Sequence, residues 1–164
     1  MNPCRCGYLS DSERACSKAP ICAQHYMARI SGPMLDRFDI MLDVEEVSPE
    51  HLLTTQESEA TASIKNRIEA AREFASQRLN TTNAPLNSVM NAEDIKSELE
   101  NNPEITDILN SAMKAQKLSA RGLHKAVRVA RTIADLNASV SISKLHMLEA
   151  LSYRQFLTGK LHSG

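Results

Sequence analysis

Apolar residues recur at helical spacing through most of the second half of the chain. The stripe over residues 58–79 predicts a long helix, and shorter helices are predicted over 92–100 and from Pro103 onward. A helix over 120–136 and a last helix after Ser143 follow the same spacing. Together these segments predict a small antiparallel helical bundle.

Residues that favour helix starts mark the boundaries of these segments. Asn102, Pro103 and Glu104 supply in order a cap, a proline for the first helical position and an acid for the first turn. Ser119 and Ser143 are expected to cap the last two helices. The positions expected to face inward on those two helices are Leu123, Ala126, Val127, Ala130, Ile133, Ala134, Leu145, Leu148, Leu151 and Phe156.

The first third of the chain has a different pattern. A short helix is predicted over 21–30, and Gly32-Pro33 ends it because this pair cannot continue a helix. Met34, Leu35 and Phe38 are spaced to hold the following turn against a core.

Apolar and largely acidic residues then alternate from Phe38 to Val44, which predicts a strand with one buried face. A polar connector containing Pro49 separates this part from the helices. The predicted division is 1–47, a linker over 48–57, and 58–164.

Composition narrows the class of protein. Of the 164 residues, 42% are hydrophobic and only 4% aromatic, with no tryptophan, which favours helices packed on small side chains. The net charge of −1 excludes a global field that attracts nucleic acid or an acidic membrane, so any DNA contact requires a local patch. Because no long apolar run and no signal-peptide segment occur, we expect a cytoplasmic protein without membrane contact.

Four cysteines fall within one short segment, as C-x-C-x9-C-x5-C. In a cytoplasmic protein, clustered cysteines are metal ligands or free thiols more often than disulfides, and a group of thiolates suits tetrahedral zinc. The candidate ligands are Cys4, Cys6, Cys16 and Cys22. Cys22 falls in the predicted helix over 21–30, where it can instead be a small buried side chain, and His25 is a substitute ligand.

Basic residues on the helix over 120–136 are the candidate DNA patch. They are Arg121, Lys125, Arg128 and Arg131. Their helical spacing distributes them over more than one face, and acidic residues nearly balance basic ones in the chain as a whole.

Arg37 lies between apolar anchors, on a segment that packing would make rigid. An arginine held in this way can be directed at a group outside its own domain. The alternative is a structural ion pair with Asp36 or Asp39.

The chain carries no motif of a free-standing enzyme. The phosphate-loop pattern G-x-x-x-x-G-K-[ST] is absent, as are a nucleophile elbow and H-E-x-x-H. The single Gly-Lys pair, Gly159-Lys160, lacks the upstream glycine and is followed by Leu161. The sequence therefore offers no loop of its own to bind nucleotide phosphates.

Three segments, in this order and at these intervals, resemble the magnesium-chelatase-like AAA+ ATPases. They are Met1-Asn2-Pro3-Cys4-x-Cys6-Gly7-Tyr8, then Arg29-Ile30-Ser31-Gly32-Pro33-x-Leu35-Asp36-Arg37-Phe38-Asp39, then Leu118-Ser119-Ala120-Arg121-Gly122 with Arg128-Val129-Ala130-Arg131-Thr132-Ile133-Ala134-Asp135-Leu136. The resemblance implies a mainly α chain: a remnant of the AAA+ α/β core over 1–47, with one or two strands and a cysteine-containing loop, followed by a helical lid over 58–164. It also implies a homo-oligomeric ring whose ATP hydrolysis, with Mg²⁺, moves DNA in branch migration and natural transformation.

The resemblance also assigns roles by position. Asn2 matches the sensor-1 asparagine that orients the attacking water. Arg37 matches the arginine finger that enters the nucleotide site of a neighbouring protomer. Arg121 matches the sensor-2 arginine at the start of a lid helix, with Arg128 as the alternative; both would contact nucleotide.

The sequence departs from the family pattern in two places. Family members carry the phosphate loop and the acidic Mg²⁺ strand upstream, so the resemblance implies the C-terminal part of a longer protein, inactive as an ATPase alone. An N-terminal fragment with the phosphate loop is the partner it would need. The fourth cysteine of the family pattern is replaced by Lys18, so a zinc site requires Cys22 or His25 in its place. The alternatives to the ATPase interpretation are a non-enzymatic zinc-knuckle and helical-bundle interaction module, and a vestigial gene product.

Overall fold

The computed structural model describes residues 4–9, 13–42, 44, 47, 58–79, 86–100, 102–116 and 118–159. The described chain is mainly helical, which confirms the predicted fold class. Its helices are α1 (Ile21–Met27), α2 (Gly32–Leu35), α4 (Thr61–Leu79), the 3₁₀ helix η1 (Asn87–Val89), α5 (Ala92–Glu100), α6 (Pro103–Gln116), α7 (Ala120–Leu136) and α8 (Lys144–Gly159).

Side-chain caps fix where several of these helices begin. Ser119 has extended backbone angles, and its Oγ accepts a hydrogen bond from the Gly122 N–H at 3.0 Å. The Ser143 Oγ accepts from the His146 N–H at 3.3 Å. Both caps were predicted from sequence and are confirmed, because a cap depends on residues within one turn.

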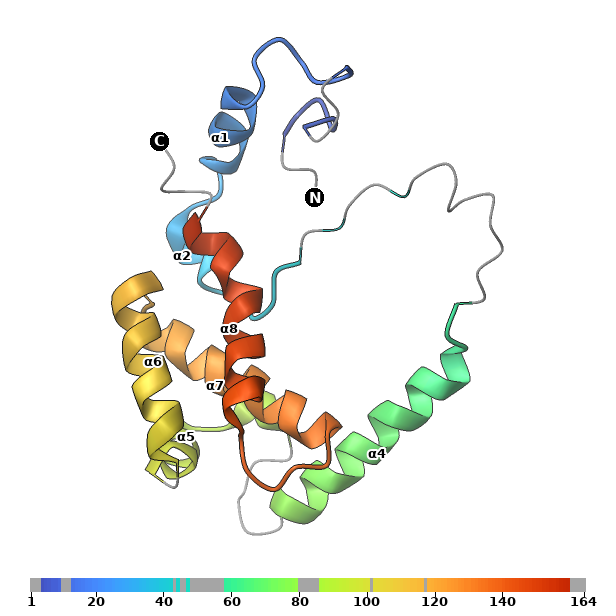
Figure 1. Cartoon of the computed structure of the whole chain (residues 1–164), viewed down its shortest axis with the longest axis vertical. Helices are drawn as coiled ribbons and strands as arrows, with labels where there is room; N and C mark the ends of the chain where they lie inside the picture. The colour runs from blue at the N-terminus through green and yellow to red at the C-terminus, as the bar shows by residue number, and fades with distance from the viewer. Residues whose placement is uncertain are drawn as a thin grey trace.

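The core lies where α5, α6, α7 and α8 meet. α8 packs against α7 and α6, and α5 lies across the N-terminal end of α6 (Figure 1). The buried residues of this core are Met90, Ile95, Ile105, Leu109, Ala112, Ala126, Val127, Val129, Ala130, Ile133, Ile142, Met147, Ala150 and Leu151. Small residues on α7 allow close approach of α8, as the composition indicates.

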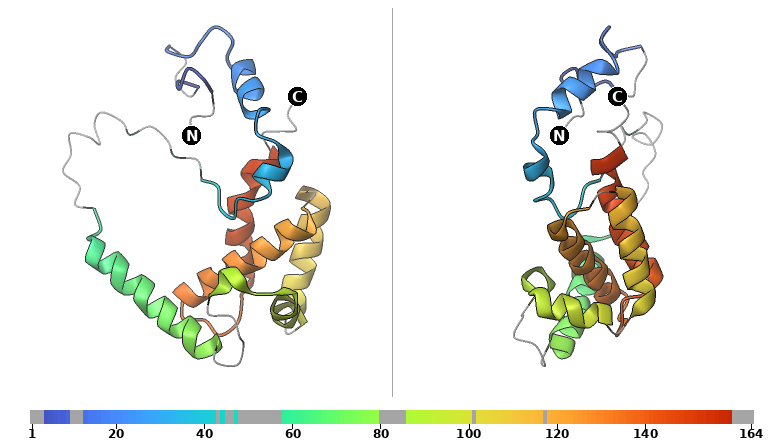
Figure 2. Two further views of the ribbon diagram at one scale, coloured as in Figure 1. Left: turned by 180° about the vertical axis from the view of Figure 1, so that it is seen from behind. Right: turned by 90° about the vertical axis from the view of Figure 1, so that its left-hand side faces the viewer.

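The remaining helices project from this bundle. Both views in Figure 2 place α1 beyond the C-terminal end of α8 and α2 beside that end, and α4 extends away from α7. α4 is attached by its C-terminal end, where Leu79 is 5% exposed, whereas all its residues from 61 to 70 are exposed.

Charged residues are buried between α4, α5 and α7. Arg131 is fully buried and donates to the Asp135 carboxylate, at 3.0 and 3.1 Å, and to the Val140 carbonyl at 2.9 Å. Arg78 of α4 binds the same carboxylate at 3.3 Å and lies 3.6 Å from Glu98 of α5. This network fixes the C-terminal end of α4 to the bundle.

The predicted strand from Phe38 to Val44 is wrong for the residues described there, which include no strand. A strand forms only where its backbone pairs with another strand. Here the Met41 N–H donates instead to the Tyr153 carbonyl of α8 at 3.1 Å. Ile40 and Leu42 are 49% and 67% exposed.

Two predicted sets of buried residues hold only in part. Leu35 is buried, but Met34 and Phe38 are 51% and 45% exposed, because Leu35 alone faces the bundle. On α8, Leu145 is 76% exposed, and Met147 fills the core in its place. Among the described helices, none combines the length and apolar content that crossing a membrane requires.

Candidate functional site

The segment that carries Arg37 is held against the bundle by its acidic neighbour. The Asp36 carboxylate accepts hydrogen bonds from the Ser119 Oγ at 2.9 and 3.1 Å, and the Arg154 Nη2 lies 3.4 Å from it. Ser119 is the cap of α7, and Arg154 belongs to α8. Asp36 therefore joins residues 36–39 to both helices.

Arg154 is the buried part of this contact. Its side chain is 2% exposed, and its Nη1 donates to the Phe38 carbonyl at 2.9 Å. Burial lowers the pKa of the Arg154 guanidinium, while the charges of Asp36 and Asp39 act in the opposite direction.

Lys125 of α7 forms the third attachment. Its ammonium donates to the Arg37 carbonyl and lies 3.0 Å from the Asp39 carboxylate. The Lys125 side chain is only 12% exposed. We call these contacts of Asp36, Arg154 and Lys125 the clamp.

The clamp leaves the Arg37 side chain exposed. Asp36 and Asp39, the two acids expected to compete for it, are paired with Arg154 and Lys125. Within the part of the chain that the structure describes, the Arg37 guanidinium forms no hydrogen bond or ion pair. The geometry is therefore that of a free arginine on a fixed backbone.

A basic pocket of about 420 Å³ opens beside the clamp, at the N-terminal half of α7. It is lined by Ala120, Arg121, His124, Lys125 and Arg128. Arg121 is exposed in the first turn of α7, where the helix dipole favours anions. The pocket combines three cationic side chains, which suits a multiply charged oxyanion.

Arg128 and Arg131 serve the fold more directly than the sequence suggests. Arg128 donates through Nη2 to the Met90 carbonyl, which anchors it at one wall of the basic pocket. Arg131 is fully buried, so it is excluded from any surface patch for DNA.

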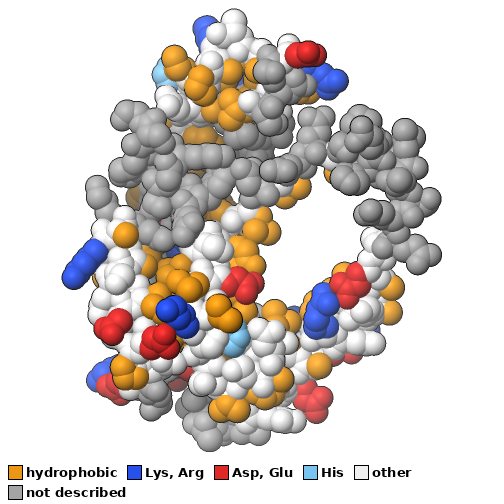
Figure 3. Space-filling model, viewed as in Figure 1, with side chains coloured by type: hydrophobic (Ala, Val, Ile, Leu, Met, Phe, Trp, Pro, Cys, Tyr) orange, Lys and Arg blue, Asp and Glu red, His pale blue; other side chains and the backbone are white. Residues whose placement is uncertain are grey.

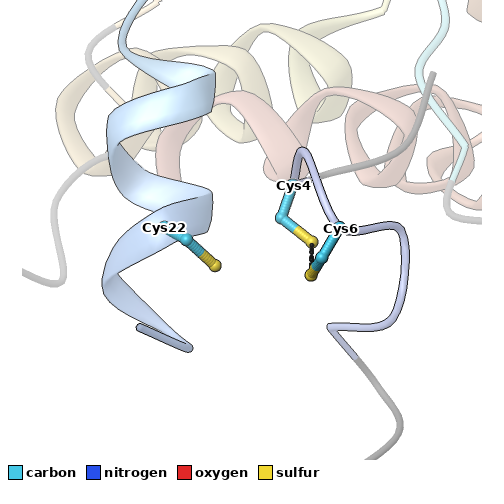
Figure 4. A group of neighbouring side chains, drawn as sticks. All are labelled: Cys4, Cys6 and Cys22. Atoms are coloured by element: carbon cyan, nitrogen blue, oxygen red, sulfur yellow. Dashed lines mark hydrogen bonds between the residues drawn. The ribbon is translucent and has the colours of Figure 1, made fainter. Parts of the chain in front are cut away.

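Three cysteine thiols converge between the N-terminal loop and α1. Cys4 and Cys6 come from the loop and Cys22 from α1, and their sulfurs point toward one another (Figure 4). All three sulfurs lie within 4.8 Å of one another, and Cys4 and Cys6 are 3.0 Å apart. This group can hold a metal ion.

Cys16 stands beside this group. The Cys4 thiol, followed by backbone hydrogen bonds to Cys16 and Tyr8, lowers the pKa of Cys6 to about 6. The Cys16 thiol, burial and the neighbouring cysteine charges raise the pKa of Cys22 to about 12. The exposed His25, the alternative ligand, is not part of the group.

The structure brings together some of the predicted residues but not all. Arg121 and Arg128 line the basic pocket on α7, and the Arg37 carbonyl binds Lys125 of the same pocket. Cys4, Cys6 and Cys22 form a separate cluster, with Cys16 beside it. Asn2 lies outside the described residues. The role of Arg154 was missed, because nothing in its sequence neighbourhood distinguishes it from an ordinary surface arginine.

Two families match the chain. Residues 58–154 match the family described as magnesium chelatase, subunit ChlI C-terminal. Residues 1–52 match the family described as magnesium chelatase, subunit ChlI.

Full-length relatives are much longer than the chain. The competence protein ComM of Haemophilus influenzae is 33% identical over 94% of this chain and 29% of its own length. YifB of Escherichia coli, an uncharacterized protein, is 36% identical over the same shares. An uncharacterized protein of Mycobacterium tuberculosis is 27% identical over 94% of the chain and 30% of its own length. The chain thus spans less than a third of these relatives.

Proposed function

Because the chain belongs to the magnesium chelatase ChlI family, we propose that it is the C-terminal part of a ring-forming AAA+ ATPase. In this proposal, residues 1–47 are the end of the AAA+ core, 48–57 are a linker, and 58–164 are the lid. The chain supplies an arginine finger and sensor residues, while the phosphate loop belongs to another part of the assembly.

The observation that carries this proposal is the exposed guanidinium of Arg37 on a clamped backbone. Phosphoryl transfer depends on positioning and on charge placed at the transferred group, and an arginine supplied in trans accelerates it by about 10³–10⁵-fold. A planar fork with a permanent charge suits phosphate oxygens better than an ammonium does. The clamp fixes the residues on either side of Arg37 and leaves its side chain available to a neighbouring protomer.

Arg121 is the proposed sensor-2 residue. In this role it contacts the phosphates of the nucleotide bound to its own protomer. Its exposure in the basic pocket and the dipole of α7 support this assignment. Arg128 lines the same pocket and is the alternative. Asn2 is the proposed sensor-1 residue. ATP and Mg²⁺ are then ligands of the complete assembly, and Mg²⁺ supplies charge neutralisation at the phosphates.

The work of the assembly is proposed to be DNA remodelling in the cytoplasm. Support comes from the name of one relative, a competence protein. The partners are other protomers of the ring, or an N-terminal fragment that carries the phosphate loop.

The test is ATP turnover with and without such a fragment. The purified chain alone is expected to hydrolyse no ATP. Adding the amino-terminal portion of a ComM or YifB relative, where family members carry the phosphate loop, should produce turnover. Turnover by the chain alone that disappears in Asn2→Ala would refute the proposed division of labour.

A metal centre at the cysteine cluster is a second candidate function. In this case residues 4–22 would be a zinc knuckle, and the knuckle and the helical bundle of this chain would together bind a partner protein. The observation that favours it is the convergence of three thiols within 4.8 Å, since thiolates around one zinc lie about 3.8 Å apart. Cys4, Cys6 and Cys22 would hold the ion, with Cys16 as the fourth ligand.

Zinc content and thermal melting test this candidate. Protein purified without added zinc should contain about one zinc per chain and melt earlier after chelation. Cys4→Ser and Cys22→Ser should lose the zinc, whereas His25→Ala should keep it. Equal zinc content in all the variants would exclude the cluster as the site.

A further inference from the structure

Lys125 lies at the junction of the basic pocket and the Arg37 segment. It lines the basic pocket together with Arg121, His124 and Arg128. Its ammonium also donates to the Arg37 carbonyl and pairs with Asp39 at 3.0 Å. Among the three clamp residues, Lys125 is the one that also lines this pocket.

An anion in the basic pocket would compete with the Arg37 segment for this ammonium. A lysine ammonium has three donors on a flexible stem, and multiply charged phosphate oxygens are stronger acceptors than a backbone carbonyl. The Asp39 carboxylate is 60% exposed, so water weakens its hold on Lys125. The Lys125 contacts are therefore the part of the clamp that an anion can remove.

The other two attachments do not depend on the pocket. Asp36 is held by Ser119 and Arg154, and Arg154 also binds the Phe38 carbonyl at 2.9 Å. Arg154 is 2% exposed and is not among the residues that line the pocket. These contacts keep the segment on the bundle when Lys125 leaves it.

We infer that Lys125 is a positioning residue that couples polyphosphate binding beside Arg121 to the placement of Arg37. An empty pocket leaves Lys125 on the Arg37 carbonyl and Asp39. A polyphosphate in the pocket draws the ammonium away, and the backbone at Arg37 shifts about the Asp36 attachment. This inference rests on the proposed function: it makes the nucleotide state of one protomer change the finger offered to the next.

The test is an NMR titration of the ¹⁵N-labelled chain with inorganic triphosphate. In the wild type, the amides of Arg37 and Phe38 should shift with the same midpoint as the amide of Arg121. In Lys125→Gln, Arg121 should still shift, with affinity about tenfold weaker because one charge-assisted hydrogen bond is lost. At equal saturation of Arg121, the Arg37 and Phe38 shifts should be absent.

Three further variants complete the test. Lys125→Arg keeps the charge and should restore most of the Arg37 response. Asp39→Asn removes a competing carboxylate, so triphosphate should bind more tightly, and the Arg37 amide should already lie nearer its bound position. Lys144→Gln is the matched control: this lysine pairs with Glu104 at 3.8 Å, lies outside the basic pocket, and should change neither response.

Two results would overturn the coupling while leaving Arg121 as a phosphate contact. One is an Arg121 shift without an Arg37 shift in the wild type. The other is an Arg37 shift of full size in Lys125→Gln. If Arg121 itself does not respond to triphosphate, its assignment in the proposed function is wrong, and the coupling fails with it.

Discussion

Asp36 neutralises an arginine that has almost no access to water. Arg154 is 2% exposed, and its polar contacts to the Arg37 segment are the Asp36 carboxylate and the Phe38 carbonyl. A buried charge that loses its partner is costly, whereas an exposed pair contributes little. Asp36 and Asp39 both lie close to Arg37 in the sequence, but their side chains are 29% and 60% exposed. Only the loss of Asp36 should therefore lower the stability of the chain appreciably.

We predict that Asp36→Ala destabilises the chain by about 2 kcal/mol, because Arg154 keeps its charge without a counter-ion. Asp39→Ala is the matched control and should cost about 0.5 kcal/mol, because water screens its pair with Lys125. Urea unfolding followed by circular dichroism measures both. Equal losses in the two variants would show that Asp36 is not the attachment that the structure indicates.

At the scale of the helices, the sequence predicts the features that depend on neighbouring residues and misses those that depend on residues far apart in the chain. The start of α7 at Ala120 and its Ser119 cap were predicted, because they depend on residues one turn apart. The predicted strand after Phe38 is wrong for the residues described there, because a strand needs a partner that no local pattern specifies. The clamp was also missed, because Asp36 and Arg154 are separated by 118 positions in the sequence.

The same contrast between local and distant causes applies to the basic residues of the candidate site. Arg37 was selected from its local anchors and from resemblance, and the structure adds that its acidic neighbours are paired elsewhere. The sequence pattern places Arg131 among the cations of a candidate surface patch, although it is fully buried against Asp135. Its spacing on α7 did not reveal this, because the carbonyls that it binds come from the loop after the helix.

Two glycines at helix starts should respond differently to alanine. A Cβ at Gly122 would lie 3.2 Å from the Arg154 Nη2 and 3.4 Å from the Ser119 Oγ, whereas one at Gly32 meets nothing within 4 Å apart from its chain neighbours. Because Arg154 is buried and cannot move aside, Gly122→Ala should destabilise the chain by about 1 kcal/mol despite its helix propensity. Gly32→Ala should change the stability by less than about 0.5 kcal/mol, because the gain from restricting the unfolded chain is offset by the contact of the new Cβ with the following Pro33 ring.

Thermal and urea unfolding of the two alanine variants check this pair. Stabilisation by Gly122→Ala of the size that propensity alone predicts, about 1 kcal/mol, would mean that the space between α7 and α8 is looser than the structure shows.

The molecule as a whole has a packed bundle and surfaces that the bundle does not cover. Ile64 and Ile68 of α4 are 37% and 43% exposed. An apolar groove of about 570 Å³, whose lining includes Ile40 and Leu42, lies between the 39–42 segment, α7 and α8. Hydrophobic side chains gather along this side of α8 in Figure 3. Both surfaces leave apolar side chains exposed in the isolated chain.

Amide hydrogen exchange should distinguish the exposed half of α4 from the packed bundle. The amides of α4 from 64 to 70 should exchange about 10³-fold faster than those of α7, because every residue in this half of α4 is exposed. The amides near Leu79 should be protected by the Arg78 contacts to Asp135 and Glu98. Exchange measured by mass spectrometry checks this, and uniform protection along α4 would contradict the one-ended attachment.

The most direct measurement is ATP turnover in the assembly formed with a phosphate-loop fragment, compared between wild type, Arg37→Ala and Arg72→Ala. Arg72 is an exposed arginine of α4, outside the clamp and the basic pocket. Arg37→Ala should lower kcat by about 10³-fold or more, with nucleotide affinity nearly unchanged, because the finger acts on the transition state. Arg72→Ala should leave turnover unchanged. Wild-type turnover in Arg37→Ala, or an equal loss in both variants, would contradict the assignment of Arg37 as the finger.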